Sequence, residues 1–477
     1  MAARKLILVA TLAMMGLWCA YAQTGQSADS PKSPAQSTDP AQSEAGSSSS
    51  KPHSSNTSAN REHHRIQVED EASQPHELTA AEDLIQKKDY AAAEPLLRKF
   101  LDSNPSNYEA WYDLGFTDNG LGKIDESIAA YRKSVEAKPD LFESNLNLGR
   151  QLAKAHQPDA EQYLRAATRL KPADPDTEHV VELRAGAWFS LAQAIQQSNP
   201  DEALDAYRKA AELQPKSVEP HLEIGRIFEE QNKFADAEQE YRQVLALKPD
   251  KEASADALAG LANIHMRGRV LVEAEADLRK LVVLRPDSAN AHLQLGRVLE
   301  AENKNDDAIA ELETAAKLAP SDPAVRRELA DLYLAAGKDA QAEPAYRALL
   351  TAHPNDAELH RALGQTFLRE KKFPEALQEL LATVKLKPDW ADAYFDLAFA
   401  ASENKDYPLT LKALDIRAKS QPENARTYFL RGSALDHLHD FKQAAANYHL
   451  FLKTAGGKYP DYEWQAKHRL IAIEPKK

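Results

Sequence analysis

The stretch that decides the fold is residues 289–320, which read ANAHLQLGRVLEAENKNDDAIAELETAAKLAP. Residues 357–388 repeat its frame as AELHRALGQTFLREKKFPEALQELLATVKLKP. The residue types that recur are, in the first copy, His292, Leu295, Gly296, Ala308, Leu312 and Pro320. Two apolar segments that keep this register predict a pair of helices that recurs along the chain.

The frame extends over most of the chain, and a proline closes every unit except the last, where Gly456 and Gly457 stand in its place. These prolines are Pro105, Pro139, Pro172, Pro215, Pro249, Pro286, Pro320, Pro354, Pro388 and Pro422. Most are 34 residues apart, which is the signature of a helix-turn-helix solenoid. The 43-residue spacing between Pro172 and Pro215 marks an insertion around residues 173–183. We expect the insertion to lengthen the first helix of its unit, with Thr177 and Glu178 at its start.

The units resemble the tetratricopeptide repeat (TPR) family. Another copy of the frame contains Trp111, Leu114, Gly115, Ser127, Tyr131 and Pro139. The resemblance implies an all-α, right-handed superhelical TPR solenoid of helix-turn-helix repeats. About eleven repeats would fill residues 74–458, and residues 459–477 would form a C-terminal capping helix and tail. Glycines such as Gly296 would let the second helix approach, with alanines such as Ala308 opposite them.

The first 22 residues have the composition of an export signal. Arg4 and Lys5 precede an uncharged run, and Ala20-Tyr21-Ala22 is typical of a cleavage site. We therefore expect a signal peptide over residues 1–22 and a periplasmic or secreted protein. The alternative is that residues 6–22 stay uncleaved and anchor the chain in the inner membrane, because about 17 apolar residues can just span a bilayer.

Residues 23–73 form a Ser/Pro/Gln/Ala-rich segment that contains no Phe, Trp or Tyr, and 13 of its 51 residues are serine. Such a composition cannot bury enough apolar area to offset the entropy of ordering. We predict a disordered linker over residues 23–73.

Composition excludes several classes of function. The 59 basic and 73 acidic side chains give a formal net charge of −14, which argues against nucleic acid as a partner. The single cysteine excludes an internal disulfide framework and a thiolate metal cage. No nucleotide-binding, hydrolase or zinc-protease motif occurs, so we predict that the chain is not an enzyme and needs no cofactor.

The histidines that stand out are interpreted as structural. His437, His439 and His449 lie near acidic residues, but a polar turn explains them better than a metal site. His221, His292 and His360 recur where the TPR family usually has tryptophan, and equivalent positions in a solenoid do not converge on one ligand.

The TPR resemblance implies that the first helix of every unit lines a concave groove that holds a partner. Its cationic positions would be Arg150, Lys154, Arg226, Arg267, Arg297, Arg327, Arg361 and Arg369. Its acidic positions would be Glu143, Glu219, Glu229, Glu230, Asp256, Glu300, Asp331 and Glu358. Arginine suits the carboxylates and carbonyls of an extended peptide. The alternative is that these charges only pair with one another.

Aromatic residues are the second candidate contact set, and they cluster toward the two ends of the array. They are Tyr112, Phe116, Phe395, Phe399 and Phe429. Grouped exposed aromatics are typical of an interface. The alternative is that neighbouring repeats cover them. The Lys and Asn set by which some TPR domains bind a C-terminal carboxylate is absent in matching form.

Together these observations favour a non-enzymatic protein-protein interaction scaffold or assembly factor of the bacterial cell envelope, binding a partner polypeptide in the concave groove. The alternative is an envelope TPR protein that binds or helps export polysaccharide, in which the aromatic residues would stack on sugar rings.

Overall fold

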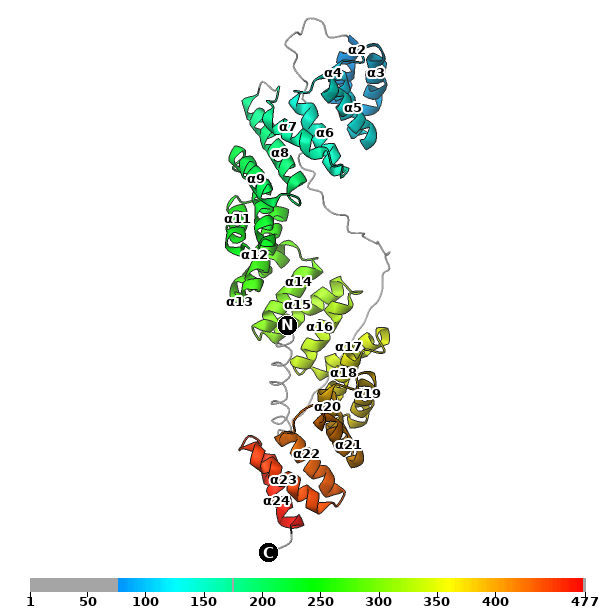
Figure 1. Ribbon diagram of the computed structural model, residues 1–477, viewed down its shortest axis with the longest axis vertical. Helices are drawn as coiled ribbons and strands as arrows, with labels where there is room; N and C mark the ends of the chain where they lie inside the picture. The colour runs from blue at the N-terminus through cyan, green and yellow to red at the C-terminus, as the bar shows by residue number, and fades with distance from the viewer. Residues whose placement is uncertain (1–75, 174–175, 475–477) are drawn as a thin grey trace, which may run out of the picture. The chain divides into compact units, whose positions relative to one another are not determined.

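The computed structural model describes residues 76–173 and 176–474, in which all regular secondary structure is α-helical (Figure 1). The expectation of an all-α chain is confirmed for this part of the sequence. The described residues divide into two compact units, an N-terminal unit up to Leu284 and a C-terminal unit from Arg285.

The N-terminal unit contains twelve helices in the described residues. Their bounds are α2 (His76–Gln86), α3 (Tyr90–Ser103), α4 (Tyr108–Gly120), α5 (Ile124–Ala137), α6 (Phe142–Lys154), α7 (Ala160–Arg169), α8 (Thr177–Ile195), α9 (Pro200–Leu213), α10 (Glu219–Glu230), α11 (Phe234–Ala246), α12 (Lys251–Gly268) and α13 (Leu271–Leu284).

The C-terminal unit contains eleven helices in the described residues. Their bounds are α14 (Ala289–Ala301), α15 (Asn305–Leu318), α16 (Pro323–Ala335), α17 (Asp339–Ala352), α18 (Ala357–Arg369), α19 (Phe373–Leu386), α20 (Ala391–Glu403), α21 (Tyr407–Ala418), α22 (Ala425–His437), α23 (Phe441–Ala455) and α24 (Pro460–Ile473).

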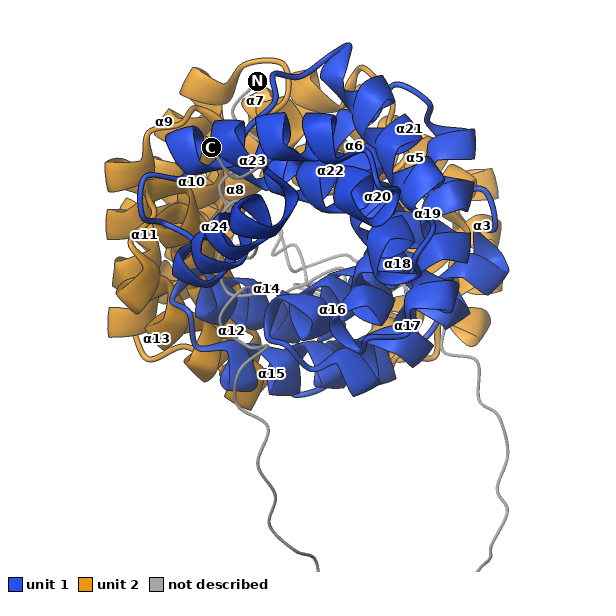
Figure 2. Ribbon diagram, turned by 90° about the horizontal axis from the view of Figure 1, so that it is seen from below, with its two compact units in different colours: residues 1–34, 285–477 blue, residues 35–284 orange. Residues whose placement is uncertain are grey.

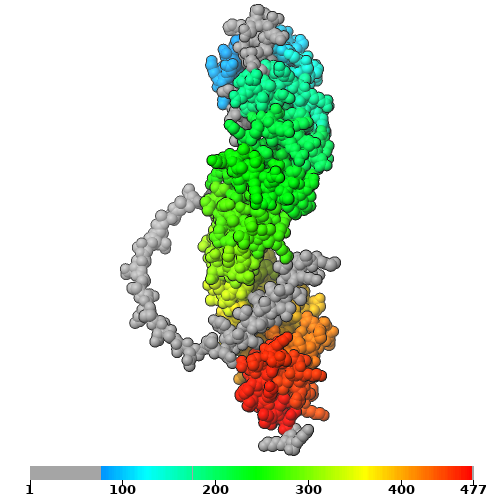
Figure 3. All heavy atoms as spheres, turned by 90° about the vertical axis from the view of Figure 1, so that its left-hand side faces the viewer, coloured from blue at the N-terminus to red at the C-terminus, as the bar shows by residue number. Residues whose placement is uncertain are grey.

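Consecutive helices pack in pairs, from α2 with α3 through α22 with α23, and α24 packs on α23 as a final single helix. Within each unit the pairs follow one another in chain order, as the graded colours of the space-filling view show (Figure 3). The repeating prolines lie two to four residues beyond the end of a second helix. This placement is expected because proline cannot donate a hydrogen bond to a continuing helix.

The inserted residues lengthen a first helix, as expected. Helix α8 has 19 residues, whereas α6 has 13. Its N-cap is Asp176, whose carboxylate accepts the backbone N–H of Glu178 at 3.0 Å. The helix therefore begins at Thr177, but the capping side chain is the aspartate before it and not Thr177 or Glu178.

The recurring glycines allow close helix packing, but the residue that approaches them differs from the expected alanine. A Cβ atom on Gly115 would lie 2.7 Å from the Tyr131 ring, and one on Gly364 would lie 2.8 Å from Leu380. The recurring alanines, such as Ala308, are fully buried beside this contact. A large side chain one turn further along the second helix therefore fills the space that glycine leaves.

In several repeats a side chain of the first helix donates a hydrogen bond to the carbonyl oxygen of the preceding proline, which holds the start of the helix in place. Trp111 Nε1 donates to the Pro105 carbonyl oxygen at 2.8 Å. The same bond, six residues back along the chain, is made by Asn145 to Pro139 at 2.9 Å, His292 to Pro286 at 3.1 Å and His360 to Pro354 at 2.9 Å. His292 and His360, at the usual tryptophan position, thus keep its hydrogen bond.

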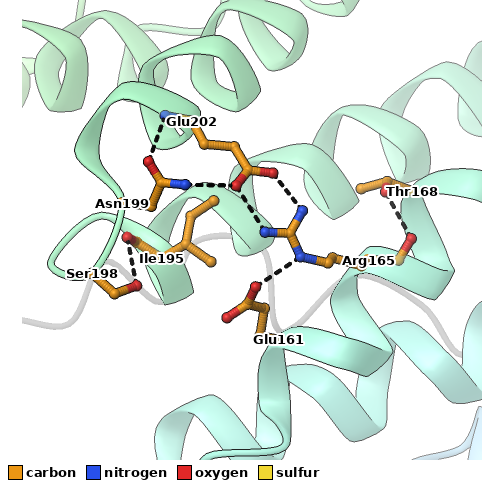
Figure 4. Close-up of polar contacts among 7 residues, drawn as sticks. All are labelled: Glu161, Arg165, Thr168, Ile195, Ser198, Asn199 and Glu202. Carbon is orange, nitrogen blue, oxygen red and sulfur yellow. Dashed lines mark hydrogen bonds and ion pairs between the residues drawn. The ribbon is translucent and has the colours of Figure 1, made fainter.

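Second helices are linked by ion pairs near the protein surface. Arg165 on α7 forms a bidentate ion pair with Glu202 on α9, with Nη2 2.8 Å from Oε2 (Figure 4). The α9 N-cap Asn199 also donates to Glu202, at 2.9 Å, and Arg165 bonds Glu161 within its own helix. Hydrogen bonding to Arg165 lowers the pKa of Glu202. Because such exposed pairs contribute little stability, burial of apolar side chains is the main force that holds the repeats together.

Candidate partner-binding face

The first helices of the pairs form one continuous face in each unit, which we call the inner face. Consecutive first helices contact each other, as α6 does with α8 and α18 with α20. In the C-terminal unit, Figure 2 shows α16, α18 and α20 toward the inside and α17, α19 and α21 outside them. The candidate contact residues Arg150, Arg226, Arg297 and Arg361 lie on first helices, on the side turned toward neighbouring first helices.

In the C-terminal unit the inner-face arginines bind carboxylates of the next repeat. Arg297 donates from Nε to Glu328 at 2.8 Å and forms a second, shorter contact with the same carboxylate. Arg327 contacts Asp356 at 3.1 Å and Glu358 at 2.5 Å. These pairs bridge consecutive first helices and hold the guanidinium groups in fixed positions.

Arg361 makes the most buried of these bridges. Its Nε lies 2.7 Å from Asp396 Oδ2, and the two residues are only 8% and 5% exposed. Gln365 donates to the same oxygen at 2.9 Å, and the Trp390 ring lies 4.6 Å from the guanidinium carbon. Arg369 turns to the neighbouring repeat, where it bonds Asp339 at 3.0 Å and the Leu334 carbonyl at 2.6 Å.

In the N-terminal unit Arg226 is paired in the same manner. It contacts Glu223 at 2.7 Å and Asp256 on α12 at 3.1 Å. Lys154 and Arg267 are exposed, and the Arg267 guanidinium lies 5.7 Å from the centre of the Phe234 ring. For most of the predicted arginines, therefore, the structure supports the reading in which inner-face charges pair with one another.

Several carboxyl groups of the inner face are harder to ionise than free ones. Burial raises the pKa of Glu223, Glu300 and Asp331. Asp331 accepts a hydrogen bond from the buried Tyr346 hydroxyl at 2.7 Å, and burial with this neighbouring carboxylate raises the pKa of Tyr346. The inner face thus combines fixed cations with carboxylates that are partly withdrawn from solvent.

Arg150 is partly buried but forms no ion pair with any described residue. Its Nε donates to Ser190 Oγ on α8 at 2.8 Å, and that hydroxyl donates to the Gly186 carbonyl at 2.8 Å. Burial lowers the pKa of Arg150 to about 10, which leaves it charged at neutral pH. Neither Ser190 nor Gly186 stood out in the sequence, because a serine and a glycine on a helix carry no pattern of their own.

Two of the five aromatic candidates are buried, so the prediction that they are exposed is wrong. Tyr112 is 4% exposed and packs on the Tyr131 ring at 5.8 Å, while its hydroxyl accepts from Asn147 at 3.2 Å. Phe395 is 9% exposed, with the Arg426 guanidinium 4.6 Å from its ring centre. Packing of neighbouring elements covers both rings, as the alternative interpretation had it.

The other three aromatic candidates are half-buried. Phe116 packs edge-on against Tyr90, with ring centres 6.1 Å apart. Phe429 lies 5.1 Å from Phe451 and 4.6 Å from Tyr462, which belongs to the final helix α24. The final helix therefore covers Phe429, and Tyr112 and Phe395 do not offer the exposed rings on which sugar stacking would depend.

The histidines near the last turn have separate contacts. The His437 ring stacks on Tyr407 at 4.4 Å, His439 packs edge-on against Phe441, and His449 contacts Glu474 at 2.7 Å. Within residues 76–173 and 176–474, no group of three or more histidine, cysteine or acidic side chains is placed to hold a metal ion.

None of the helices described here is long and apolar enough to span a bilayer. The predicted signal peptide, residues 1–22, and the predicted linker, residues 23–73, lie outside the described residues.

Comparison with protein families gives the identity of the repeats. One model of the tetratricopeptide repeat matches residues 78–142, 260–323, 293–357 and 327–393, and a second matches residues 194–264. Together these matches cover more than half of the chain. The chain belongs to the tetratricopeptide repeat family. The TPR assignment agrees with the helix pairs, the packed glycines and the prolines described above.

The TPR segments are similar to parts of longer proteins. The human protein O-mannosyl-transferase TMTC1 is 30% identical over 183 residues, which cover 37% of this chain and 19% of the human protein. Tetratricopeptide repeat protein 37 of Xenopus laevis is 34% identical over 87 residues, which cover 18% of this chain and 6% of that protein. The chain thus spans less than a fifth of the length of these relatives.

Solved TPR structures resemble it as well. YrrB, described as a TPR protein with an unusual peptide-binding site, is 21% identical with a TM-score of 0.37 and covers 40% of this chain and 96% of its own. The Cut9-Hcn1 hetero-tetramer of the APC/C is 15% identical with a TM-score of 0.36 and covers 84% and 97% of the two chains. These likenesses concern the helical repeat fold alone.

Proposed function

We propose that this TPR protein is a non-enzymatic scaffold or assembly factor that binds a partner polypeptide on its inner face. The observation that carries the proposal is the inner face that the first helices form, on which Arg297 and Arg327 are ordered by contacts with the next repeat while Lys154 and Arg267 are exposed. Side chains that are already ordered lose little entropy on binding, so such a surface favours association.

We further propose that the scaffold acts in a bacterial cell envelope. Support for this part comes from the sequence, in which Arg4, Lys5 and the uncharged run before Ala22 are typical of an export signal. Fractionation of cells, with N-terminal sequencing of the mature chain, tests it. A periplasmic chain that begins at Gln23 supports the proposal, whereas an unprocessed cytosolic chain contradicts it.

Affinity capture from an envelope extract, read by mass spectrometry, tests partner binding. The inner-face variant combines Lys154→Glu and Arg267→Glu, because both residues are exposed and neither forms a described ion pair. The matched control makes the same charge change on second helices, with Lys317→Glu and Arg169→Glu, two exposed residues that form no described ion pair.

A partner that the parent and the control retain, and the inner-face variant loses, supports the proposal. A partner retained equally by all three chains places binding elsewhere on the molecule. The paired arginines Arg226 and Arg297 are unsuitable for charge reversal, because each reversal would bring several carboxylates together.

A further inference from the structure

Arg150 occupies a place where three consecutive first helices meet. It lies on α6 and bonds Ser190 on α8, while Asn147 on the same helix bonds the Tyr112 hydroxyl on α4. The Arg150 charge acts on Tyr112, whose pKa burial raises and Arg150 lowers. These contacts define a polar cluster on the inner face of the N-terminal unit, which we call the Arg150 cluster.

The packing around Arg150 fixes one edge of the guanidinium. Nε is held by the Ser190 hydroxyl, whose own proton is engaged by the Gly186 carbonyl. The absence of a side chain at Gly186 makes room for the other edge, since a Cβ atom there would lie 2.8 Å from Arg150 Nη2. The Nη groups, in contrast, have no hydrogen-bond partner among the described residues.

No described carboxylate forms an ion pair with Arg150. The acidic neighbours Glu143 and Asp113 raise the pKa of Tyr112, and neither forms a described ion pair with Arg150. Glu143 instead accepts the backbone N–H of Ala173 at 3.0 Å. A partly buried cation without a counter-ion is costly, and a ligand carboxylate would offset that cost.

We propose that the Nη edge of Arg150 binds a carboxylate of an extended partner peptide. A guanidinium edge matches a carboxylate with two parallel hydrogen bonds, which gives both affinity and direction. The carboxylate belongs either to an acidic side chain or to a C-terminus, since both present the same two oxygens. This inference rests on the proposed function, because it assigns one contact of the partner polypeptide on the inner face.

The first test measures anion binding directly in the full chain. Arginine is labelled with ¹⁵N at Nε, and sodium acetate is compared with sodium chloride at equal ionic strength. We expect a saturable shift of the Arg150 Nε–H signal with acetate and not with chloride. The Arg361 signal is an internal control, because Asp396 already occupies that guanidinium.

An Arg150→Gln variant assigns the signal, and an unchanged Arg165 Nε–H signal, from the neighbouring helix α7, shows that this part of the variant is folded. Equal shifts with acetate and chloride, or no shift at Arg150, would overturn the inference.

Three synthetic hexapeptides distinguish the two sources of carboxylate. The first is acetyl-Gly-Gly-Ser-Ala-Gly-Ala with a free C-terminus, the second is the same peptide amidated, and the third is amidated with aspartate in place of serine. A response to the first alone identifies a C-terminus, and a response to the third alone identifies an acidic side chain. An equal response to the second peptide would overturn the inference, because that peptide has no carboxylate.

Affinity capture with the Arg150→Gln chain separates this inference from the proposed function. For a peptide that binds through this contact, we expect the affinity to fall roughly ten- to hundredfold. Capture of the inner-face partner that is unchanged by Arg150→Gln leaves the scaffold function standing and overturns the role of Arg150. An acetate response without any inner-face partner confirms the anion site and contradicts the scaffold function.

Discussion

Arg361 in the C-terminal unit and Arg150 in the N-terminal unit both lie on first helices and both reach toward the next first helix. Asp396 and Gln365 surround the charge of Arg361, whereas Arg150 meets a serine hydroxyl and the bare backbone of a glycine. Arginine therefore links two repeats through an ion pair at Arg361, whereas at Arg150 it has no described counter-ion. What distinguishes them is the side chain that the following repeat supplies.

The largest difference between the two arginines is expected for the variant Arg361→Met. The variant leaves Asp396 buried with only the Gln365 amide as a described donor, so we expect the free energy of unfolding to fall by about 3–5 kcal/mol. Urea unfolding followed by circular dichroism measures the loss. Because repeats couple mainly to their neighbours, the transition can also split in two.

The control for this experiment is the double variant Arg361→Met with Asp396→Leu, which replaces the whole buried pair with apolar side chains. We expect it to recover most of the stability. A single variant as stable as the parent would show that the Arg361–Asp396 bridge contributes nothing.

An intermediate effect is expected at Arg469, which joins α24 to the last repeat. Its Nε and Nη2 donate to Asp436 at 2.6 and 2.7 Å, but the arginine side chain is half exposed. Arg469→Gln should cost about 1–2 kcal/mol at pH 7 in urea unfolding. Lys467→Gln, a charge loss on the same helix, is the control.

This loss should depend on pH in a defined direction. Hydrogen bonding to Arg469 holds the pKa of Asp436 below its usual value of 3.8. The folded state therefore binds fewer protons than the unfolded state, and the stabilisation is complete above pH ~5. It declines as the pH falls through the folded pKa, so the difference between parent and variant should shrink below pH ~4. A difference that stays constant down to pH 2 would contradict the role of this ion pair.

Arg150→Met should change the free energy of unfolding by less than about 1 kcal/mol in either direction. The variant loses one hydrogen bond to Ser190 but also removes a charge that has no described counter-ion. The same urea measurement compares it directly with Arg361→Met. A loss as large as that of Arg361→Met would show that the two arginines are equivalent bridges and would remove the distinction drawn above.

The smallest effect on stability is expected from Gly186→Ala. The added Cβ would meet the end of a flexible side chain at 2.8 Å, and alanine favours the helix by roughly 0.5–1 kcal/mol, so the net change should be below about 1 kcal/mol. Acetate binding at Arg150, measured by the arginine ¹⁵N shift, should nevertheless weaken. Gly268→Ala on α12 controls for helix propensity alone, and an equal acetate response in both variants would contradict the role of Gly186 as a spacer.

Most of the fold could be predicted from the sequence because a repeat multiplies each weak signal. The spacing of Pro320 and its counterparts places the helix pairs, and the insertion before Pro215 correctly predicts a longer α8. Contacts between repeats could not be predicted to the same degree. Whether Arg361 meets Asp396, or Arg150 meets Ser190, depends on side chains 30 to 40 residues away whose relative rotation no single-repeat pattern specifies.

The sequence left open for the same reason whether Tyr112 and Phe395 are exposed or covered by neighbouring repeats. A first-helix position that faces inward in the family frame is exposed only if its neighbours are short, and here Tyr131 and Arg426 cover the rings. An aromatic residue at such a position therefore indicates packing between repeats at least as often as it indicates an interface.

The bond from the first helix to the preceding proline has a consequence for how TPR sequences diverge. Tryptophan, asparagine and histidine all make it in this chain, at Trp111, Asn145, His292 and His360. In these four repeats the bond needs only a side-chain N–H at a given reach, and Asn145 shows that it does not need an aromatic ring.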